Sequence, residues 1–288
     1  MPVSFKPTIF RCAASVCILL TSLTSFASSN ARIIATGGGT MLEGSAGGGL
    51  VPWAILSGYS DEDEFGGALG ISHVKAKDFS LDAAAIAINW HNRIELSFAR
   101  QRFDIDKVAA GEHLQQDIVG AKVRLAGDLV YTRVPQIAFG IQYKRNSSFT
   151  IPNAVGALDD NDIDVYLTAS KVWLNGPFNR SVLASGTLRA TRANQLGLLG
   201  FGGDNNRDHE LMLEVSAGLF FNRHWVIGAE YRQKPDNLGA LKEDDWQDVF
   251  IGWFPNKRVS VVLAWAGLGS IAGFDNQDSY YLSVQLSQ

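Results

Sequence analysis

Nine charged residues lie in stretches where apolar and polar residues alternate. They are Glu95, Lys122, Arg124, Arg189, Glu210, Glu214, Glu230, Arg232 and Asp248. Successive side chains of a β-strand point to opposite faces, so the alternation puts these charges on one face of each strand. In a closed barrel they would project into a single lumen. Two interpretations stay open: salt bridges that fill a narrow barrel, or the lining of a water-filled pore that selects solutes.

The histidines do not suggest a catalytic set. They are scattered along the chain at His73, His91, His113, His209 and His224. Acyl hydrolysis by a serine enzyme needs His, Ser and an acidic residue close together, and no such set stands out on one strand face. We therefore expect no catalytic residues and no enzyme. An outer-membrane hydrolase is the third function considered, after the two given at the end of this section.

Two loops resemble ligand-binding motifs only in part. "DDNDID", residues 159–164, begins like a calcium loop, but Val165 stands where Gly is needed and no Glu closes the site. "LGLLGFGGDNN", residues 196–206, is Gly-rich but lacks the Lys-Ser/Thr of a phosphate-binding loop. We expect a solvated extracellular loop in the first case, with a divalent cation bridging it to lipopolysaccharide as the alternative. The second is expected to be flexible or to fold over a barrel mouth, and neither a cofactor nor a metal site is predicted.

The elements that must position the nine charges are strands of period two. In "DDWQDVFIGWFPNKRVSVVLAWAG", residues 244–267, Val249, Ile251 and Trp253 share one face before a polar turn at 255–257. The apolar series resumes after the turn at Val259, Val261, Leu263 and Trp265. Two such runs across a short turn predict a β-hairpin. Its apolar face would be the core of a soluble sandwich or the lipid face of a membrane barrel.

The connections and the aromatic residues favour the barrel. Short turns that carry Asn and a basic residue alternate with long loops, and sorting of this kind is typical of outer-membrane barrels. The short turns lie at residues 90–93, 175–180, 221–224 and 255–258, with a fifth near 128–133. Aromatic residues of the apolar series fall near strand ends, as in membrane aromatic girdles. They are Trp90, Trp173, Trp225, Trp253, Trp265, Tyr143 and Tyr231.

The prediction is therefore an all-β fold: an antiparallel transmembrane β-barrel of about twelve strands, which occupies residues 65–288. An even number of strands puts both ends of the barrel on the periplasmic side. One strand is unusual, because Lys171 falls in its outward series. Either the side chain reaches the rim beside Trp173, or a bulge shifts the register.

The N-terminus has the pattern of a secretory signal peptide. Lys6 and Arg11 precede a short apolar stretch, and small residues follow at the predicted cleavage site near Ala27. We expect export to the outer membrane and a signal peptide over residues 1–27; an uncleaved amphipathic start is the alternative. Both cysteines, Cys12 and Cys17, lie in this part. Its removal would leave 23 basic against 29 acidic residues, a balance that argues against nucleic acid as a partner.

A Gly-rich segment, residues 28–64, precedes the barrel, and we expect it inside the lumen as a plug. Small residues in the inward series of the first strands leave room for it. They are Gly66, Ala68, Gly70, Ser72, Ala83, Ala85 and Ala87. In this interpretation Trp53 lies in the lumen and not on the lipid face.

Several stretches resemble the bacterial family described as domain of unknown function 3034. They are "GGGLVPWAILSGY", "RIELSFARQRFD", "DIVGAKVRLAGD", "GTLRATRANQLGLLGFGGD", "EYRQKPDNL" and "DDWQDVFIGWFPNK". Together they extend from about residue 47 to the C-terminus, and long loop sequences take part. The resemblance implies an exported outer-membrane protein of Gram-negative bacteria and supplies no catalytic residues. The chain ends "LSVQLSQ" without the usual terminal aromatic residue, which suggests a weaker assembly signal.

The sequence leads to one principal expectation and one main alternative. The first is a narrow or gated passive channel for small solutes. The second is a non-conducting structural or interaction barrel whose extracellular loops bind a partner. Expected partners are outer-membrane lipid, lipopolysaccharide and the barrel-assembly machinery.

Overall fold

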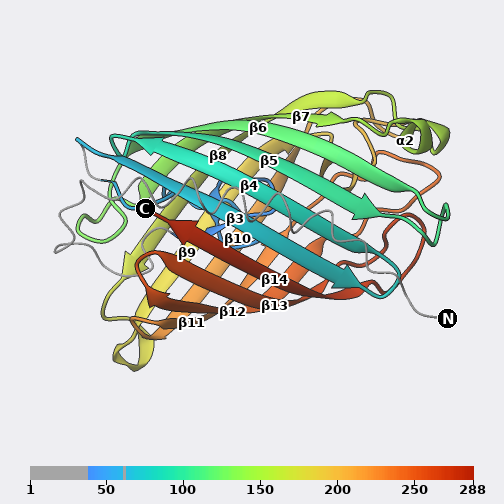
Figure 1. Cartoon of the computed structure of the whole chain (residues 1–288). Coiled ribbons are helices and arrows are strands. Elements are labelled where there is room, and N and C mark those ends of the chain that lie inside the picture. Colours follow the sequence, from blue (N-terminus) through green and yellow to red (C-terminus); the bar gives the residue numbers. More distant parts are fainter. Residues whose placement is uncertain (1–37, 61–62) are drawn as a thin grey trace, which may run out of the picture. The chain divides into compact units, whose positions relative to one another are not determined.

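The computed structural model describes residues 38–60 and 63–288, so the predicted signal peptide and its cleavage site lie outside the described residues. Twelve antiparallel strands close into one barrel (Figure 1). Each strand pairs with its neighbour in sequence, and the last pairs with the first. The strands are β3 (Phe65–Ala76), β4 (Ser80–Trp90), β5 (Ile94–Asp104), β6 (His113–Ala126), β7 (Gln136–Asn146), β8 (Asn161–Trp173), β9 (Ser181–Thr191), β10 (Glu210–Asn222), β11 (Trp225–Arg232), β12 (Trp246–Asn256), β13 (Val259–Gly267) and β14 (Asp278–Ser287). The predicted all-β barrel of about twelve strands is confirmed.

Each strand turns an apolar face outward, and its inward face carries polar and small residues together with some larger apolar ones. In the β12–β13 hairpin, Val249 pairs with Trp265 and Ile251 with Leu263, and these four side chains are 39–51% exposed. Phe250, between the two outward residues of β12, is buried. A continuous apolar outer surface of this extent needs hydrocarbon and not water around it. The lipid-facing interpretation of the apolar series is therefore confirmed.

Aromatic side chains form two belts around the outside. The belt near the short turns contains Trp90, Trp173, Trp225 and Trp253. The belt near the long loops contains Tyr143, Tyr231, Trp265 and Tyr280. Trp and Tyr favour the membrane–water interface, where an apolar ring meets a polar edge. The two belts mark the two surfaces of the bilayer.

The connections are sorted between the two ends of the barrel, as expected. The short-turn end carries connections 91–93, 127–135, 174–180, 223–224 and 257–258. The long-loop end carries 105–112, 147–160, 192–209, 233–245 and 268–277, together with the tight turn 77–79. Asn92 and Asn179 have φ of 47° and 54°, a conformation that Asn tolerates better than most residues. The described helical elements, such as α2 (Thr150–Ala154), are short, and none is long and apolar enough to cross a membrane.

The described part of the Gly-rich segment lies inside the barrel (Figure 1), where every residue from 38 to 58 is buried. We call residues 38–58 the luminal segment. It contains one small hairpin, β1 (Gly39–Thr40) with β2 (Ala46–Gly47), and is otherwise irregular. A Cβ placed on Gly70 of the wall would lie 2.8 Å from the Cβ of Thr40. The small inward residues of β3 and β4 thus make room for this segment, and Trp53 is buried within it.

A second segment enters the lumen from the long-loop end. Residues 193–203 are all buried, and they include η3 (Asn194–Gly197). This is the Gly-rich loop of the sequence, and it folds into the mouth of the barrel. We call residues 193–203 the mouth loop.

Lys171 is accommodated without a bulge. The pairing of β8 with β9 runs without a register shift from Val165 to Trp173, so that alternative was wrong. The Lys171 ammonium donates hydrogen bonds to the carbonyls of Asp128 and Thr132 in the connection between β6 and β7. The charge therefore reaches the rim, where the loop backbone covers it.

Candidate functional site

Most of the nine predicted lumen residues are buried inside the barrel. Seven are at most 6% exposed: Glu95, Lys122, Arg189, Glu214, Glu230, Arg232 and Asp248. Arg124 lies near the short-turn end of β6, where it donates to the carbonyl of Gly127 at 2.8 Å. Glu210 is the first residue of β10 and is exposed, with a hydrogen bond of 2.9 Å from Asn206. The structure therefore brings seven of the nine into the interior and leaves two at its ends.

At the centre of the lumen, Glu43 of the luminal segment meets three cations from the wall. Arg232 donates to its carboxylate at 2.8 Å, Arg189 approaches to 3.5 Å, and Lys144 forms a further ion pair with it. Burial by itself would raise the pKa of Glu43. The charges of Arg232, Lys144 and Arg189 outweigh burial and hold the pKa well below its ordinary value. Glu43 is therefore ionised and joins the luminal segment electrostatically to the wall.

Two wall carboxylates complete this central network. Asp164 lies 2.6 Å from the Lys144 ammonium, and Glu214 lies 2.5 Å from Arg189. The Arg189 guanidinium also lies 4.8 Å from the ring centroid of Tyr166. With Glu43 the network holds three anions against three cations, so its charge balances without water or ions. Buried charge is stable only when paired in this way.

Three members of the central network were missed by the sequence prediction, but two could have been found. Lys144 follows Gln142 in the inward series of β7, so the alternation extended by one step predicts it. Asp164 was expected in a solvated loop over residues 159–164, and this was wrong, because β8 already begins at Asn161 and turns Asp164 inward. No periodic signal exists for Glu43, because it lies in irregular backbone.

A second group of wall charges binds the backbone of the luminal segment directly. Glu95 accepts hydrogen bonds from the amides of Ala46 at 3.3 Å and Ser57 at 2.6 Å. Lys122, 3.2 Å from Glu95, donates to the carbonyls of Ala46 at 3.1 Å and Trp53 at 3.3 Å. Irregular backbone away from water must find such partners for its N–H and C=O groups. Glu95 and Lys122 therefore supply the hydrogen-bond partners that a neighbouring strand would supply in a sheet.

The opposite wall does the same through Glu230. Its Oε2 accepts from the amides of Gly49 at 2.9 Å and Leu50 at 2.7 Å, while Arg232 donates to the Leu50 carbonyl at 2.9 Å. Uncharged wall side chains bond other backbone groups of the segment: Gln101, Gln136, Thr168, Ser170, Thr187 and Gln285. The inward polar face therefore serves in this structure as a set of partners for the luminal segment.

The mouth loop is held by its own buried pair. Glu243 accepts from the amide of Gln195 at 2.8 Å, and the Lys234 ammonium lies 2.8 Å from the same carboxyl group. Burial raises the pKa of Glu243 and lowers the pKa of Lys234, although the two charges attract each other. On the far side, Asn146 of β7 donates to the Leu198 carbonyl at 2.6 Å.

The residues considered for other chemistry have structural partners. Arg192 pairs with Asp162 at 2.5 Å and with Asp159 at 2.9 Å, which occupies the carboxylates considered for a divalent cation. His73 and Asp82 lie 2.7 Å apart on the outer face, and the strand partner on the other side of His73 is a leucine. Among the described residues, no group of three or more His, Cys, Asp or Glu side chains could hold a metal ion.

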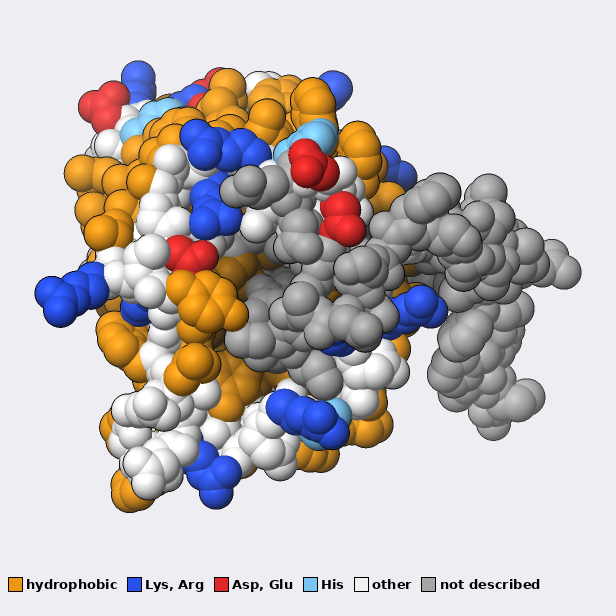
Figure 2. Space-filling view, turned by 90° about the vertical axis from the view of Figure 1, so that its left-hand side faces the viewer, with side chains coloured by type: hydrophobic (Ala, Val, Ile, Leu, Met, Phe, Trp, Pro, Cys, Tyr) orange, Lys and Arg blue, Asp and Glu red, His pale blue; other side chains and the backbone are white. Residues whose placement is uncertain are grey.

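A cavity opens at the short-turn end, below the luminal segment. It encloses about 940 Å³ of empty space, which includes space open to solvent. Trp53 and Ile55 of the luminal segment form part of its wall, with Leu183 and Phe220 from the barrel. Figure 2 shows this end face on, with a hollow that hydrophobic side chains line and with Lys and Arg side chains around it. The lumen is thus open to some depth from this side and filled beyond it.

The closed barrel with its apolar outer band and aromatic belts defines an outer-membrane β-barrel protein, surrounded by lipid. Within that class, the chain belongs to the family described as "Protein of unknown function (DUF3034)", whose family model matches residues 36–285. The resemblance noted from the sequence is confirmed. No curated protein matches the chain significantly.

Solved outer-membrane barrels are similar in fold. The KdgM porin superposes with a TM-score of 0.50 at 14% identity, over 76% of this chain and 98% of the porin. The NanC porin has a TM-score of 0.51 at 10% identity, again over 76% of this chain and 98% of the porin. The outer membrane phospholipase A from Escherichia coli has a TM-score of only 0.42 at 9% identity, over 81% of this chain and 94% of that one. At these identities the likeness concerns the fold alone.

Proposed function

We propose that the protein is a gated passive channel for small solutes, and that the structure represents its closed state. The observation that carries the proposal is the luminal segment. It blocks the lumen, yet side-chain hydrogen bonds and ion pairs hold it to the wall, and no strand of the wall pairs with it. A blocking element of this kind can leave without breaking the barrel.

The backbone of the wall supports this proposal. All twelve strands are hydrogen-bonded to both neighbours, so the barrel closes on itself without help from the segment. Departure of the segment would expose the inward Gln, Thr, Ser and charged side chains, and water can solvate these groups in place of the segment. An apolar wall would instead resist wetting. The polar part of the inner face is thus compatible with both a filled and an aqueous lumen.

The test is a disulfide that locks the luminal segment to the wall. The only native cysteines, Cys12 and Cys17, lie in the predicted signal peptide. In a Thr40→Cys, Gly70→Cys double variant the two Cβ atoms would lie 2.8 Å apart, so a small shift reaches the roughly 3.5–4.5 Å that a disulfide needs. The bond would anchor the segment at Thr40, and its other end is already tied to the barrel through β3.

In planar bilayers we expect single-channel steps from the reduced double variant and from the wild type. Oxidation should abolish the steps of the double variant, and reduction should restore them. The Thr40→Cys single variant is the matched control and should not respond to oxidant. Equal conductance in the oxidised and reduced states would show that the segment is not the gate.

The second candidate is a non-conducting barrel whose extracellular loops bind a partner. It is favoured by the complete pairing of the central network, which leaves no net charge to drive the segment out. Protein that folds correctly, judged by heat-modifiable gel mobility, and yet never conducts in either redox state would support this candidate over the channel.

We also propose that the protein is not an enzyme. The His73–Asp82 pair resembles part of a hydrolytic triad, but its register partner on β14 is Leu282, which cannot act as a nucleophile. Contacts with lipopolysaccharide at the long-loop end and with the barrel-assembly machinery during insertion stay predictions.

A further inference from the structure

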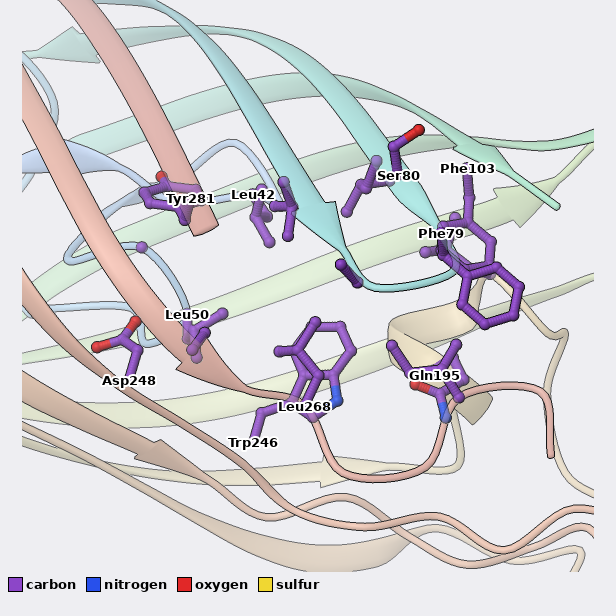
Figure 3. Close-up of a pocket in the computed structure, with 17 residues that line it drawn as sticks. Leu42, Leu50, Phe79, Ser80, Phe103, Gln195, Trp246, Asp248, Leu268 and Tyr281 are labelled. Carbon is purple, nitrogen blue, oxygen red and sulfur yellow. The ribbon is translucent and has the colours of Figure 1, made fainter. Parts of the chain in front are cut away.

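A separate apolar cavity lies in the half of the lumen nearest the long loops. It encloses about 580 Å³ of empty space, which includes space open to solvent. Its walls are mostly apolar, with Leu42 and Leu50 from the luminal segment and Phe79, Phe103 and Leu268 from the barrel and its loops. Figure 3 shows Phe79 and Phe103 at one end of the cavity and Asp248 at the other. This cavity is distinct from the one at the short-turn end.

Two buried side chains that line this cavity each have one polar atom without a hydrogen-bond partner among the described residues. Asp248 is 6% exposed and Trp246 is 4% exposed, and both belong to β12. The Oδ1 atom of Asp248 accepts no hydrogen bond, and the indole N–H of Trp246 donates none. Leaving a buried polar group unsatisfied is destabilising, and more so when the group is charged. Such a group in a native protein calls for a partner, which an ordered water, an ion or a ligand can supply.

Asp248 also lacks a cation. Its register partner across the strands is Glu230, whose Oε2 bonds the luminal segment while its Oε1 has no partner. Neither carboxyl group forms an ion pair within the described part of the chain. Lys234, whose ammonium lies 4.7 Å from the Trp246 ring centroid, is engaged with Glu243 at 2.8 Å. The end of the cavity near Asp248 therefore holds two carboxyl groups that have no cationic partner among the described residues.

We propose that this cavity binds a small molecule with an apolar body and one ammonium group. The apolar body would fill the space between Leu42, Phe79 and Leu268, and the ammonium group would donate to Asp248. The contrast with the central network supports the assignment, because there each carboxylate already has a cation of the protein. A purely apolar ligand would leave Asp248 unpaired, and an anionic ligand would place its charge beside two carboxyl groups that have no cation.

The inference goes beyond the proposed function, because it concerns ligand binding and not conductance. Binding can be measured in detergent without a membrane. The probe is 4-phenylbutylamine, and 4-phenylbutyric acid is its anionic counterpart of the same shape. Isothermal titration of the folded full chain, corrected by titration of empty micelles, should show saturable binding of the amine at one site. The acid should bind at least about tenfold more weakly, the effect of losing one hydrogen bond to a charged group.

Two variants locate the site. Asp248→Asn keeps the shape of the side chain and should weaken amine binding by about tenfold to a hundredfold. Ala266→Phe, which places a ring in the cavity, should abolish binding of both compounds. Asp208→Asn in an exposed loop is the matched control and should bind the amine like the wild type. Folding of each variant is checked by heat-modifiable gel mobility.

Three results would overturn the assignment. The first is uptake of the amine that does not exceed uptake by empty micelles. The second is equal binding of amine and acid, and the third is unchanged amine binding in both Asp248→Asn and Ala266→Phe. If Asp248→Asn fails to fold, Ala266→Phe and the comparison of amine with acid still decide.

Discussion

At the scale of single residues, Glu43 joins the luminal segment to three cations of the wall. It is fully buried and is the only member of the central network that comes from the luminal segment. Its loss would leave Lys144, Arg189 and Arg232 with two carboxylates between them. Removing one partner of a buried charge network strongly lowers stability, because it leaves a buried charge unpaired. Replacing the whole network by apolar residues costs far less.

Glu43 also makes the stability depend on pH. Its pKa is lowered in the folded protein, so it contributes stability above the ordinary pKa of glutamate, and this is lost as the pH falls through the lowered value. We expect Glu43→Gln to lower the unfolding free energy by about 3–5 kcal/mol near neutral pH. The gap to the wild type should narrow on acidification to about pH 3. Urea unfolding followed by tryptophan fluorescence measures both values.

The control for this prediction is Glu210→Gln. Glu210 is exposed at the end of β10, so its replacement should change the unfolding free energy by no more than about 0.5 kcal/mol. A difference between Glu43→Gln and the wild type that stays constant from neutral to acidic pH would contradict the role assigned to Glu43.

At the scale of elements, the barrel wall and the luminal segment are held by different forces. The wall depends on backbone ladders, whereas the segment depends on side chains that replace a ladder. These side chains must lie very close to the backbone of the segment. At Gly48 an added Cβ would lie 2.0 Å from Oε1 of Glu230. The carboxyl group that bonds Gly49 and Leu50 would have to move.

Gly48→Ala should therefore lower the unfolding free energy by about 1–3 kcal/mol and raise the open probability of the channel. The matched control is Gly186→Ala in β9, where an added Cβ has no atom within 4 Å. Urea midpoints and bilayer recordings of the two variants provide the comparison. Equal urea midpoints of the two variants would mean that the luminal segment accommodates a Cβ at Gly48 without loss of stability.

At the scale of the whole molecule, the apolar band determines where the protein resides. Ile86 lies near the middle of β4 and is 48% exposed on the outer face. Arg at the midplane of a bilayer costs about 2–4 kcal/mol. We expect Ile86→Arg to lower stability in lipid vesicles by this amount, measured by the urea dependence of heat-modifiable gel mobility.

The control for Ile86→Arg lies outside the band. Tyr131, in the connection between β6 and β7, is 80% exposed at the short-turn end. Tyr131→Arg should cost at most about 1 kcal/mol, because charge near the interface is tolerated. If the two variants were equally stable in lipid, hydrocarbon would not be the solvent of the outer face.

Much of the interior was predictable because the side-chain period of a strand is two. Glu95, Lys122, Glu230 and Asp248 follow from this alternation alone, and Lys144 would have followed from one further step along β7. The alternation cannot show how far each residue lies from the ends of its strand. Arg124 and Glu210 have the inward parity and still lie at the rims.

The sequence by itself determined the barrel, its strand number, the sorting of its connections and the lipid-facing side, because each depends on local periodicity and turn chemistry. Only the tertiary structure decided which carboxylate meets which cation, and that Asp248 meets none. Those pairings join irregular segments to strands far apart in the chain, and irregular backbone has no period from which a partner can be inferred.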